Sequence, residues 1–328
     1  MRPNLRLMST LALGLIAGTC SLSAVGQASD FPKTQIRLVV PVPPGGAADF
    51  VARLIAQEAA ESLGQSFVVA NVGGATGTIA AGQVARAKPD GYTILLSSST
   101  THGTAPAFFN KLAYDPIQNF SHLGLIATVP AVAVVHKDIP AKTIDQLIDY
   151  SKKNPARLNY ASSGNGSPLN FWGEMFKIAT GSSLQHVAYK GSGPAVADLL
   201  AGSVQVMFDG LPSLLTNIQA GNILPLAVLH PERLGPLPTV PTMAEVGYPD
   251  VVGGLWYGFS GPAGMPPDVV DKLSREFARI AQLPKVKEAF NARGVLVTHL
   301  AADAYAAFIL RENDKHRKIS EVANVKDQ

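Results

Sequence analysis

The chain is poor in cysteine and in net charge, and each shortage excludes a class of protein. It has one cysteine, Cys20, among 328 residues, so its fold does not rest on an internal disulfide, and a chain of this length can bury a sufficient core without one. The formal charge of +3 falls to about +1 without Arg2 and Arg6, which gives no electrostatic case for binding nucleic acid or an acidic membrane. Beyond the N-terminal segment no run approaches about 18 apolar residues, so no membrane-spanning helix is expected.

Motifs of common enzyme classes are missing as well. The sequence has no G-x-S-x-G elbow, no G-x-x-x-x-G-K-[ST] loop and no H-E-x-x-H pair of metal ligands. The Gly-rich segment 73–77 lacks the G-x-G-x-x-G spacing of dinucleotide-binding proteins, and the histidines show no close metal-ligand spacing. We therefore predict a protein without catalytic residues, cofactors or metal ligands; an exported hydrolase with dispersed catalytic residues is the alternative.

The first 28 residues have the pattern of a secretory signal peptide. Arg2 and Arg6 give a positive start, residues 7–17 form an apolar stretch too short to span a bilayer, and residues 26–28 (Gly-Gln-Ala) place small residues where signal peptidase cleaves. Attachment to a lipid through Cys20 is disfavoured, because the residue before it is Thr and lipidation signals have Gly, Ala or Ser there. The pattern predicts secretion into the periplasm with removal of residues 1–28.

The rest of the chain alternates short apolar runs with helical patterns, separated by glycine and proline. Such alternation predicts an α/β fold with mainly parallel sheets and helices on both faces. Strands are expected at residues 36–41, 67–70, 92–96, 123–135, 158–161, 186–189, 204–209, 224–229 and 258–261, and helices at 49–63, 78–87, 143–151, 168–179, 194–201, 213–220, 267–281, 285–292 and 301–320.

Four loops that follow strands share one chemistry. They are residues 43–49, 97–102, 162–167 and 189–193, and each combines glycine, small residues or hydroxyls just before a helical segment. The first turn of a helix has N–H groups without partners and a partial positive charge, and glycine lets a ligand approach them closely. An anion can bind there without a lysine or arginine. One such loop alone is an ordinary turn, but four of them favour a shared anion-binding cleft.

Individual side chains in these loops allow more than one role. Asp49 is expected to cap its helix and shape the loop more than to contact a ligand. His102 could donate a hydrogen bond to a carboxylate or lie at the edge of the core, and the pattern leaves both open. For Lys190 we favour the backbone of residues 189–191 over the ammonium as the binding group. Asp209 could accept a hydrogen bond from a ligand amine or hydroxyl, or could hold a neighbouring loop.

Several motifs, in order along nearly the whole chain, resemble one family. They are V-P-V-P-P-G-G-A-A-D at 40–49, K-P-D-G-Y-T at 88–93, L-N-Y-A-S-S-G at 158–164, Y-K-G-S-G-P-A at 189–195, P-T-V-P-T-M-A-E at 238–245, W-Y-G at 256–258 and G-P-A-G at 261–264. Together they resemble the Bug-type extracytoplasmic solute receptors, the binding subunits of tripartite tricarboxylate transporters. One departure lies at residues 72–73, where Val-Gly replaces the basic residue and proline that many members have.

The resemblance implies a two-lobe, type II-like periplasmic binding protein with a hinged cleft. Residues 29–130 and 253–328 would form lobe 1, and residues 131–252 would form lobe 2. In the family a ligand carboxylate is held by backbone amides, hydroxyls and bridging waters. The candidate ligand-binding residues are then Pro43, Pro44, Gly45, Gly46, Ala47, Ala48, Asp49, Thr76, Ser98, Thr100, His102, Ser162, Ser163, Gly166, Ser167, Tyr189, Lys190, Gly191 and Asp209.

The function implied by the resemblance is capture of a small carboxylate and not catalysis. The ligand would be a dicarboxylate or tricarboxylate, an acidic amino acid or an aromatic acid. A monomer would deliver it to the membrane subunits of a tripartite tricarboxylate transporter. The alternative is a ligand-loaded receptor that signals to a sensor kinase.

Overall fold

The computed structural model describes residues 30–155 and 157–327. The expected signal peptide, residues 1–28, lies outside the described residues. Within the described part of the chain, none of the helices combines the length and the apolar character needed to cross a bilayer.

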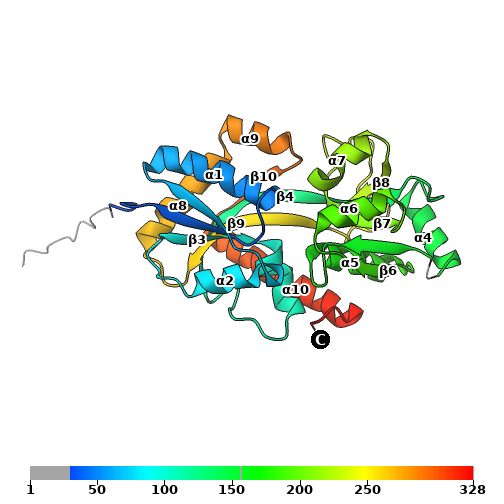
Figure 1. The fold of residues 1–328 in the computed structure, drawn as a ribbon, viewed down its shortest axis with the longest axis horizontal. Coiled ribbons are helices and arrows are strands. Elements are labelled where there is room, and N and C mark those ends of the chain that lie inside the picture. The colour runs from blue at the N-terminus through cyan, green and yellow to red at the C-terminus, as the bar shows by residue number, and fades with distance from the viewer. Residues whose placement is uncertain (1–29, 156, 328) are drawn as a thin grey trace, which may run out of the picture.

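The elements alternate along the chain as the sequence predicts (Figure 1). The strands are β1 (Ile36–Val40), β2 (Phe67–Asn71), β3 (Thr93–Ser98), β4 (Phe120–His136), β5 (Asn159–Ser162), β6 (Gln185–Ala188), β7 (Val206–Gly210), β8 (Ile223–Val228), β9 (Gly254–Pro262) and β10 (Leu296–Leu300). The helices are α1 (Ala47–Leu63), α2 (Thr78–Ala85), α3 (Ala105–Phe108), α4 (Ile144–Lys153), α5 (Pro168–Thr180), α6 (Ser192–Leu200), α7 (Leu211–Gln219), α8 (Pro267–Ala281), α9 (Pro284–Asn291) and α10 (Ala302–Ala323). A 3-10 turn, η1 (Ala75–Gly77), and a π-helical segment, η2 (Ser99–Thr104), lie in two of the loops.

Local sequence signals explain where the helices begin and end. The hydroxyl of Thr143 accepts a hydrogen bond from the Gln146 N–H at the start of α4, and Ser167 caps α5 in the same way through Asn170. At the other end, α1 stops at Gly64, whose φ of 67° places it in the left-handed region that favours glycine.

The strands form one hydrogen-bonded network with two halves joined by β4. In the first half, β2–β1–β3 pair in parallel, and β9 then pairs antiparallel with β3 and with the first part of β4, whose other partner is β10. In the second half, β6–β5–β7 pair in parallel, while the second part of β4 pairs antiparallel with β7 and β8. The α/β class is confirmed, and the long strands β4 and β9 make each half a mixed sheet.

Each half has its own hydrophobic core, and we call the two halves the first and second lobes. In the first lobe α1, α8 and α9 cover one face of the sheet, and α2 and α10 cover the other (Figure 1). Leu38 and Val39 of β1 therefore pack into different clusters on opposite faces. In the second lobe α6 and α7 face α5 across the sheet, around side chains such as Phe176 and Phe208.

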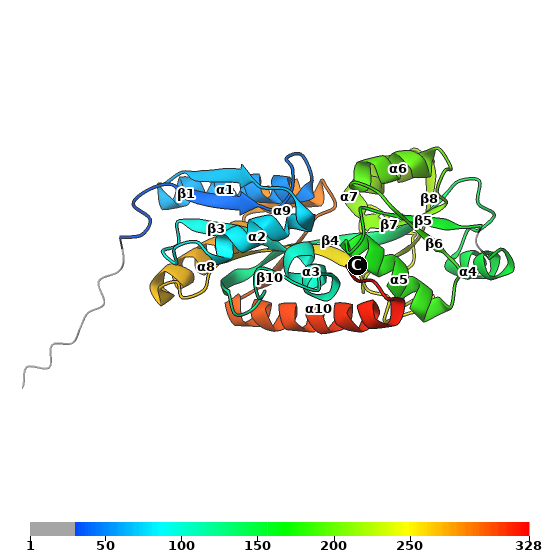
Figure 2. The same ribbon diagram turned by 60° about the horizontal axis from the view of Figure 1, so that its bottom comes forward.

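Three segments connect the lobes. Strand β4 runs through both sheets, and the chain returns at Gly253, whose carbonyl accepts a hydrogen bond from the Ala131 N–H (3.2 Å). Helix α10 lies beneath both lobes in Figure 2. Its residue Tyr305 packs with Trp256 in the first lobe, whereas Ile319 belongs to the core of the second. The boundaries at residues 130 and 253 stay a prediction, which this separation of cores supports.

Candidate ligand-binding cleft

The first-lobe loops meet at the carboxyl ends of β1, β2 and β3. A Cβ placed on Gly77 would lie 2.9 Å from the side chain of Pro41 and 3.0 Å from that of Thr101. Gly77 also has a φ of +85°, so both the lack of space for a Cβ and the backbone conformation require glycine here. A Cβ on Gly73 would in turn lie 3.5 Å from the ring of Pro43. Loops far apart in sequence are therefore packed into one surface.

Asp49 fastens the loop that precedes α1. Its carboxylate accepts hydrogen bonds from the Gly45 N–H (3.0 Å), the Asn71 side-chain amide (2.9 Å) and the Arg53 guanidinium (2.9 Å). Burial alone would raise the pKa of Asp49, but the hydrogen bonds from Arg53, Asn71 and Gly45 together outweigh it and lower that pKa. Asp49 is 5% exposed and its carboxylate oxygens already accept hydrogen bonds from other parts of the protein, so this residue shapes the loop.

The start of α1 is left open as a binding surface. Gly46 is the N-cap residue and has no side chain to accept from the first turn, so the N–H groups of Ala47 and Ala48 have no acceptor within the helix. A Cβ placed on Gly45 or Gly46 would meet no atom within 4 Å. N–H donors without an acceptor in the helix and the positive end of the helix dipole make this point attractive to an anion.

The second-lobe loops are joined in a similar way. The Ser162 hydroxyl contacts the His186 ring at Nε2 (2.7 Å) and accepts a hydrogen bond from the Gly164 N–H (3.1 Å). The Tyr189 N–H donates to the Ser162 carbonyl (3.0 Å), so a backbone hydrogen bond joins the ends of β5 and β6. Ser163 is half-buried, and Lys190 is exposed.

Asp209, at the end of β7, is a buried carboxylate. It is 1% exposed; its Oδ1 accepts a hydrogen bond from the Gly210 N–H (2.6 Å), whereas Oδ2 has no partner of full hydrogen-bond geometry among the described residues. Burial raises its pKa to about 6, and the nearby Ser192 hydroxyl, the Gly210 N–H and the Ser213 hydroxyl offset the rise only in part. Asp209 also raises the pKa of Tyr257, a buried residue of β9, although burial of the phenol is the larger cause.

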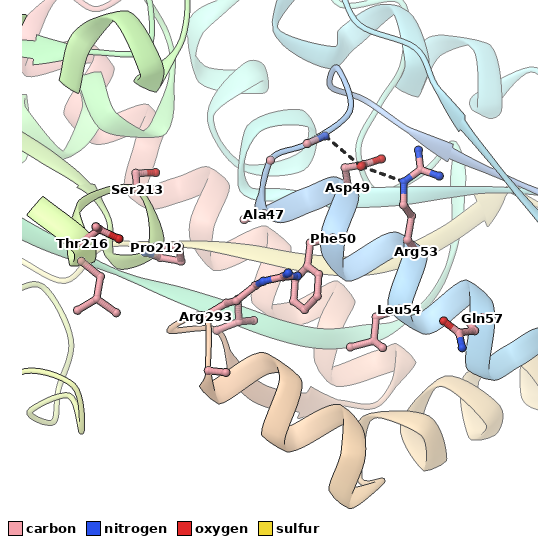
Figure 3. A pocket seen from close by; sticks show the side chains of 15 residues that line it. Ala47, Asp49, Phe50, Arg53, Leu54, Gln57, Pro212, Ser213, Thr216 and Arg293 are labelled. Carbon is pink, nitrogen blue, oxygen red and sulfur yellow. Dashed lines mark hydrogen bonds and ion pairs between the residues drawn. The ribbon is translucent and has the colours of Figure 1, made fainter. Parts of the chain in front are cut away.

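A cavity of about 820 Å³ lies between the lobes, with the start of α1 on one side and the start of α7 on the other (Figure 3). Its lining residues are Gly45, Gly46, Ala47, Asp49, Phe50, Arg53, Leu54, Gln57, Pro212, Ser213, Leu215, Thr216, Ala292, Arg293 and Val295. Of the residues expected from the sequence, the loop 43–49 thus contributes four. The expected residues of the loops after β2, β3, β5, β6 and β7 do not line this cavity.

The expected residues of the loops after β2 and β3 differ in their surroundings. His102 lies in η2 and is fully buried, with Thr101 Oγ1 3.0 Å from its Nδ1 and the Phe120 ring 4.6 Å away. Burial, with His122 as a further cause, holds the pKa of His102 well below its usual value. Thr100 is half-buried and Thr76 is exposed in η1. The His102 side chain is therefore part of the first-lobe core and not of the cavity wall.

Part of the cavity wall was not predicted from the sequence. Pro212 and Ser213 begin a helix directly after a strand, the same pattern that marked the other loops, so that rule could have found them. Phe50 and Arg293 carry no comparable signal, because one lies inside a helix and the other in a turn after α9. Among the described residues there is no group of three or more His, Cys, Asp or Glu side chains that could hold a metal ion.

Two α/β lobes with a polar-rimmed cavity between them define a solute-binding protein. Residues 51–325 match the model of the tripartite tricarboxylate transporter family receptor. The chain therefore belongs to this family, whose members are solute receptors and not enzymes. Protein BugT of Bordetella pertussis is 35% identical over 301 residues, which cover 92% of each chain.

Solved structures are similar over almost the whole chain. A protein of R. palustris solved with adipate has a TM-score of 0.83 and 33% identity, covering 91% of this chain and all of that one (100%). MatC from Rhodopseudomonas palustris, with bound malate, has a TM-score of 0.79 and 32% identity, covering 88% and 99%. Both similarities confirm the periplasmic-binding-protein fold expected from the sequence. The chain is thus a periplasmic solute receptor.

Proposed function

We propose that this receptor captures a small dicarboxylate, or a related carboxylate, in the cavity between its lobes. One carboxylate would be bound at the start of α1, by the N–H groups of Ala47 and Ala48 and by bridging waters. The loop 162–167 and residues 189–191 of the second lobe, with Asp209, would complete the site when the lobes close. Relatives solved with adipate and malate support this ligand class.

The receptor would act in the periplasm after removal of residues 1–28. It would hand the ligand to the membrane subunits of a tripartite tricarboxylate transporter, as membership of the family supports. Delivery requires release of an unchanged ligand, so no chemistry at the bound molecule is involved.

The observation that carries the proposal is the uncapped start of α1 at the cavity. A carboxylate there gains charge-assisted hydrogen bonds from N–H groups that have no acceptor within the helix. No lysine lines the cavity, and of the two arginines that do, Arg53 is held by Asp49.

Isothermal titration calorimetry with adipate, malate, succinate, butyrate and hexanoate tests the proposal. A ligand at a hundred times its Kd should also stabilise the protein by about 2.7 kcal/mol through mass action. Gly46→Leu should abolish binding, because its side chain projects into open space at the anion site. Gly235→Leu is the matched control, since a Cβ at this exposed glycine likewise meets no atom within 4 Å.

Both variants should melt within about 2 °C of the wild type, because neither glycine has a positive φ or a close neighbour. Undiminished binding by Gly46→Leu would remove the start of α1 from the site. If no carboxylate binds the wild-type protein and neutral solutes do, the ligand class is wrong.

A further inference from the structure

Arg293 is held in a fixed position at the edge of the cavity. It lies in the turn after α9, where its N–H donates to the Phe290 carbonyl (2.9 Å). Its guanidinium carbon lies 3.8 Å from the centre of the Phe50 ring, and that ring packs edge-on against Phe290, with 6.0 Å between the centroids. Figure 3 shows Arg293 and Phe50 side by side below the start of α1. The cation–π contact fixes one face of the guanidinium.

The charge of Arg293 has no ion-pair partner among the described residues, whereas the other arginine of the cavity, Arg53, pairs with Asp49 at 2.9 Å. A guanidinium has five N–H donors in its plane, and stacking on a ring leaves the edges of that plane free. These edges match the two oxygens of a carboxylate. Arg293 is therefore a cation at the wall of the binding cavity, and its N–H donors are available to an anion.

The spacing suits a ligand with two acid groups. Phe50 lies four residues after Gly46, so its backbone is about 6 Å along the helix axis from the N-cap of α1, and the Arg293 guanidinium stacks on the Phe50 ring. The wall beside it contains the apolar side chains of Leu54 and Leu215. Such a wall suits the methylene chain between two carboxylates and reduces the solvent screening of a charge pair.

The turn that carries Arg293 also touches the opposite lobe. A Cβ placed on Gly294 would lie 3.1 Å from the Leu211 side chain at the start of α7. Thr216 of the same helix lines the cavity across from Arg293 (Figure 3). A group bound by Arg293 therefore lies where the two lobes meet and can contact both.

We propose that Arg293 binds the second carboxylate of the ligand and makes this receptor selective for dicarboxylates over monocarboxylates of the same chain length. The proposal rests on the proposed function, because it requires the first carboxylate to bind at the start of α1. The apolar wall makes adipate the preferred first probe, with hexanoate as its monocarboxylate counterpart.

The experiment is calorimetric titration of adipate and hexanoate into the wild type and into Arg293→Gln and Arg293→Lys. We expect Arg293→Gln to weaken adipate binding about tenfold or more, the effect of losing one charge-assisted hydrogen-bonded pair, and to leave hexanoate unchanged. Arg293→Lys keeps the charge without the planar fork and should give an intermediate loss. Arg275→Gln, on the outer face of α8 with a side chain that is 82% exposed, is the control and should change neither affinity.

The outcomes separate the two ideas. Equal affinities of adipate and hexanoate for the wild type, or an equal loss of both in Arg293→Gln, would overturn the role of Arg293 and leave the receptor function intact. If the wild type binds none of adipate, succinate, malate and hexanoate, the proposed function fails and the role of Arg293 fails with it. A structural role for Arg293 alone would lower the melting temperature without changing the ratio of the two affinities.

Discussion

Replacing Asp209 with asparagine should stabilise the ligand-free protein at neutral pH. Asp209 is 1% exposed, and within residues 30–155 and 157–327 its Oδ1 alone has a hydrogen bond of full geometry, from the Gly210 N–H. A buried charge without sufficient partners costs free energy. Asparagine has nearly the same shape and can still accept the Gly210 hydrogen bond, and its amide can donate to the hydroxyls of Ser192 and Ser213.

The pKa of Asp209 gives the size of this effect. Burial raises this pKa from 3.8 to about 6, which lowers the stability of the folded protein by about 3 kcal/mol at a pH above both values. Because the pKa is raised in the folded state, the folded protein binds more protons than the unfolded chain between about pH 4 and pH 6. Stability is therefore lost as the pH rises through this window. Asp209→Asn should remove this pH-dependent loss of stability.

Urea unfolding of the wild type and Asp209→Asn, followed by circular dichroism at several pH values from 4.5 to 8, measures the effect. The variant should be more stable by up to about 3 kcal/mol at pH 8, and the difference should shrink toward pH 4.5. Asp271→Asn, an exposed carboxylate of α8, is the control. A destabilised variant at pH 8, or a difference that does not change with pH, would refute the reasoning. A carboxylate retained at this cost fits a role at the ligand, since functional residues often reduce stability.

Two further substitutions test the packing around the site. Asp49→Ala should lower the free energy of unfolding, measured in urea melts, by about 2–4 kcal/mol. Most of this loss would come from leaving the Gly45 N–H and the Asn71 amide without a partner, because the half-exposed ion pair with Arg53 adds little. A loss below about 0.5 kcal/mol would contradict this. His122→Gln should reduce the loss of stability in acid: burial lowers the pKa of His122 to about 4, so the contribution of this residue to stability falls by about 3 kcal/mol as the pH drops from 6.5 to 4. Exposed His299→Gln serves as its control, and an unchanged acid transition in His122→Gln would show that this residue is not responsible.

The strands and helices were predictable where apolar runs end at glycine or proline. Helix α8 begins and ends at the residues expected from the sequence, 267 and 281, and α1 ends before Gly64 as the pattern requires. Strand β10 was missed because its residues are only half-buried and carry no strong alternation. Extended structure was expected at residues 123–135, but a local pattern cannot show that a single strand of 17 residues passes through two sheets.

The polar run after β3 shows a different limit of sequence reasoning. Ser, Thr and His read as an exposed loop, yet residues 99–104 form a buried π-helical segment. Some of its polar groups have partners nearby: Ser98 and Thr101 form a reciprocal capping box, the Tyr114 hydroxyl donates to the Thr101 carbonyl (2.6 Å), and Thr101 Oγ1 lies 3.0 Å from His102 Nδ1. Ser99 Oγ and His102 Nε2 have no partner among the described residues. Composition shows that side chains are polar but not which of them are partners of one another, which is why the sequence left both a ligand-facing and a core-edge position open for His102.

The way the lobes are connected explains why the cavity residues come from such distant parts of the chain. Strands β4 and β9 and helix α10 tie the lobes together, and α10 lies along the far side from the starts of α1 and α7 (Figure 2). Rotation about these connections would displace the α1 and α7 sides most, because they lie farthest from α10. The turn that carries Arg293 already touches α7 through Gly294. We therefore expect ligand binding and lobe closure to be coupled at this turn, where a dicarboxylate held at α1 and at Arg293 would draw α7 toward the first lobe.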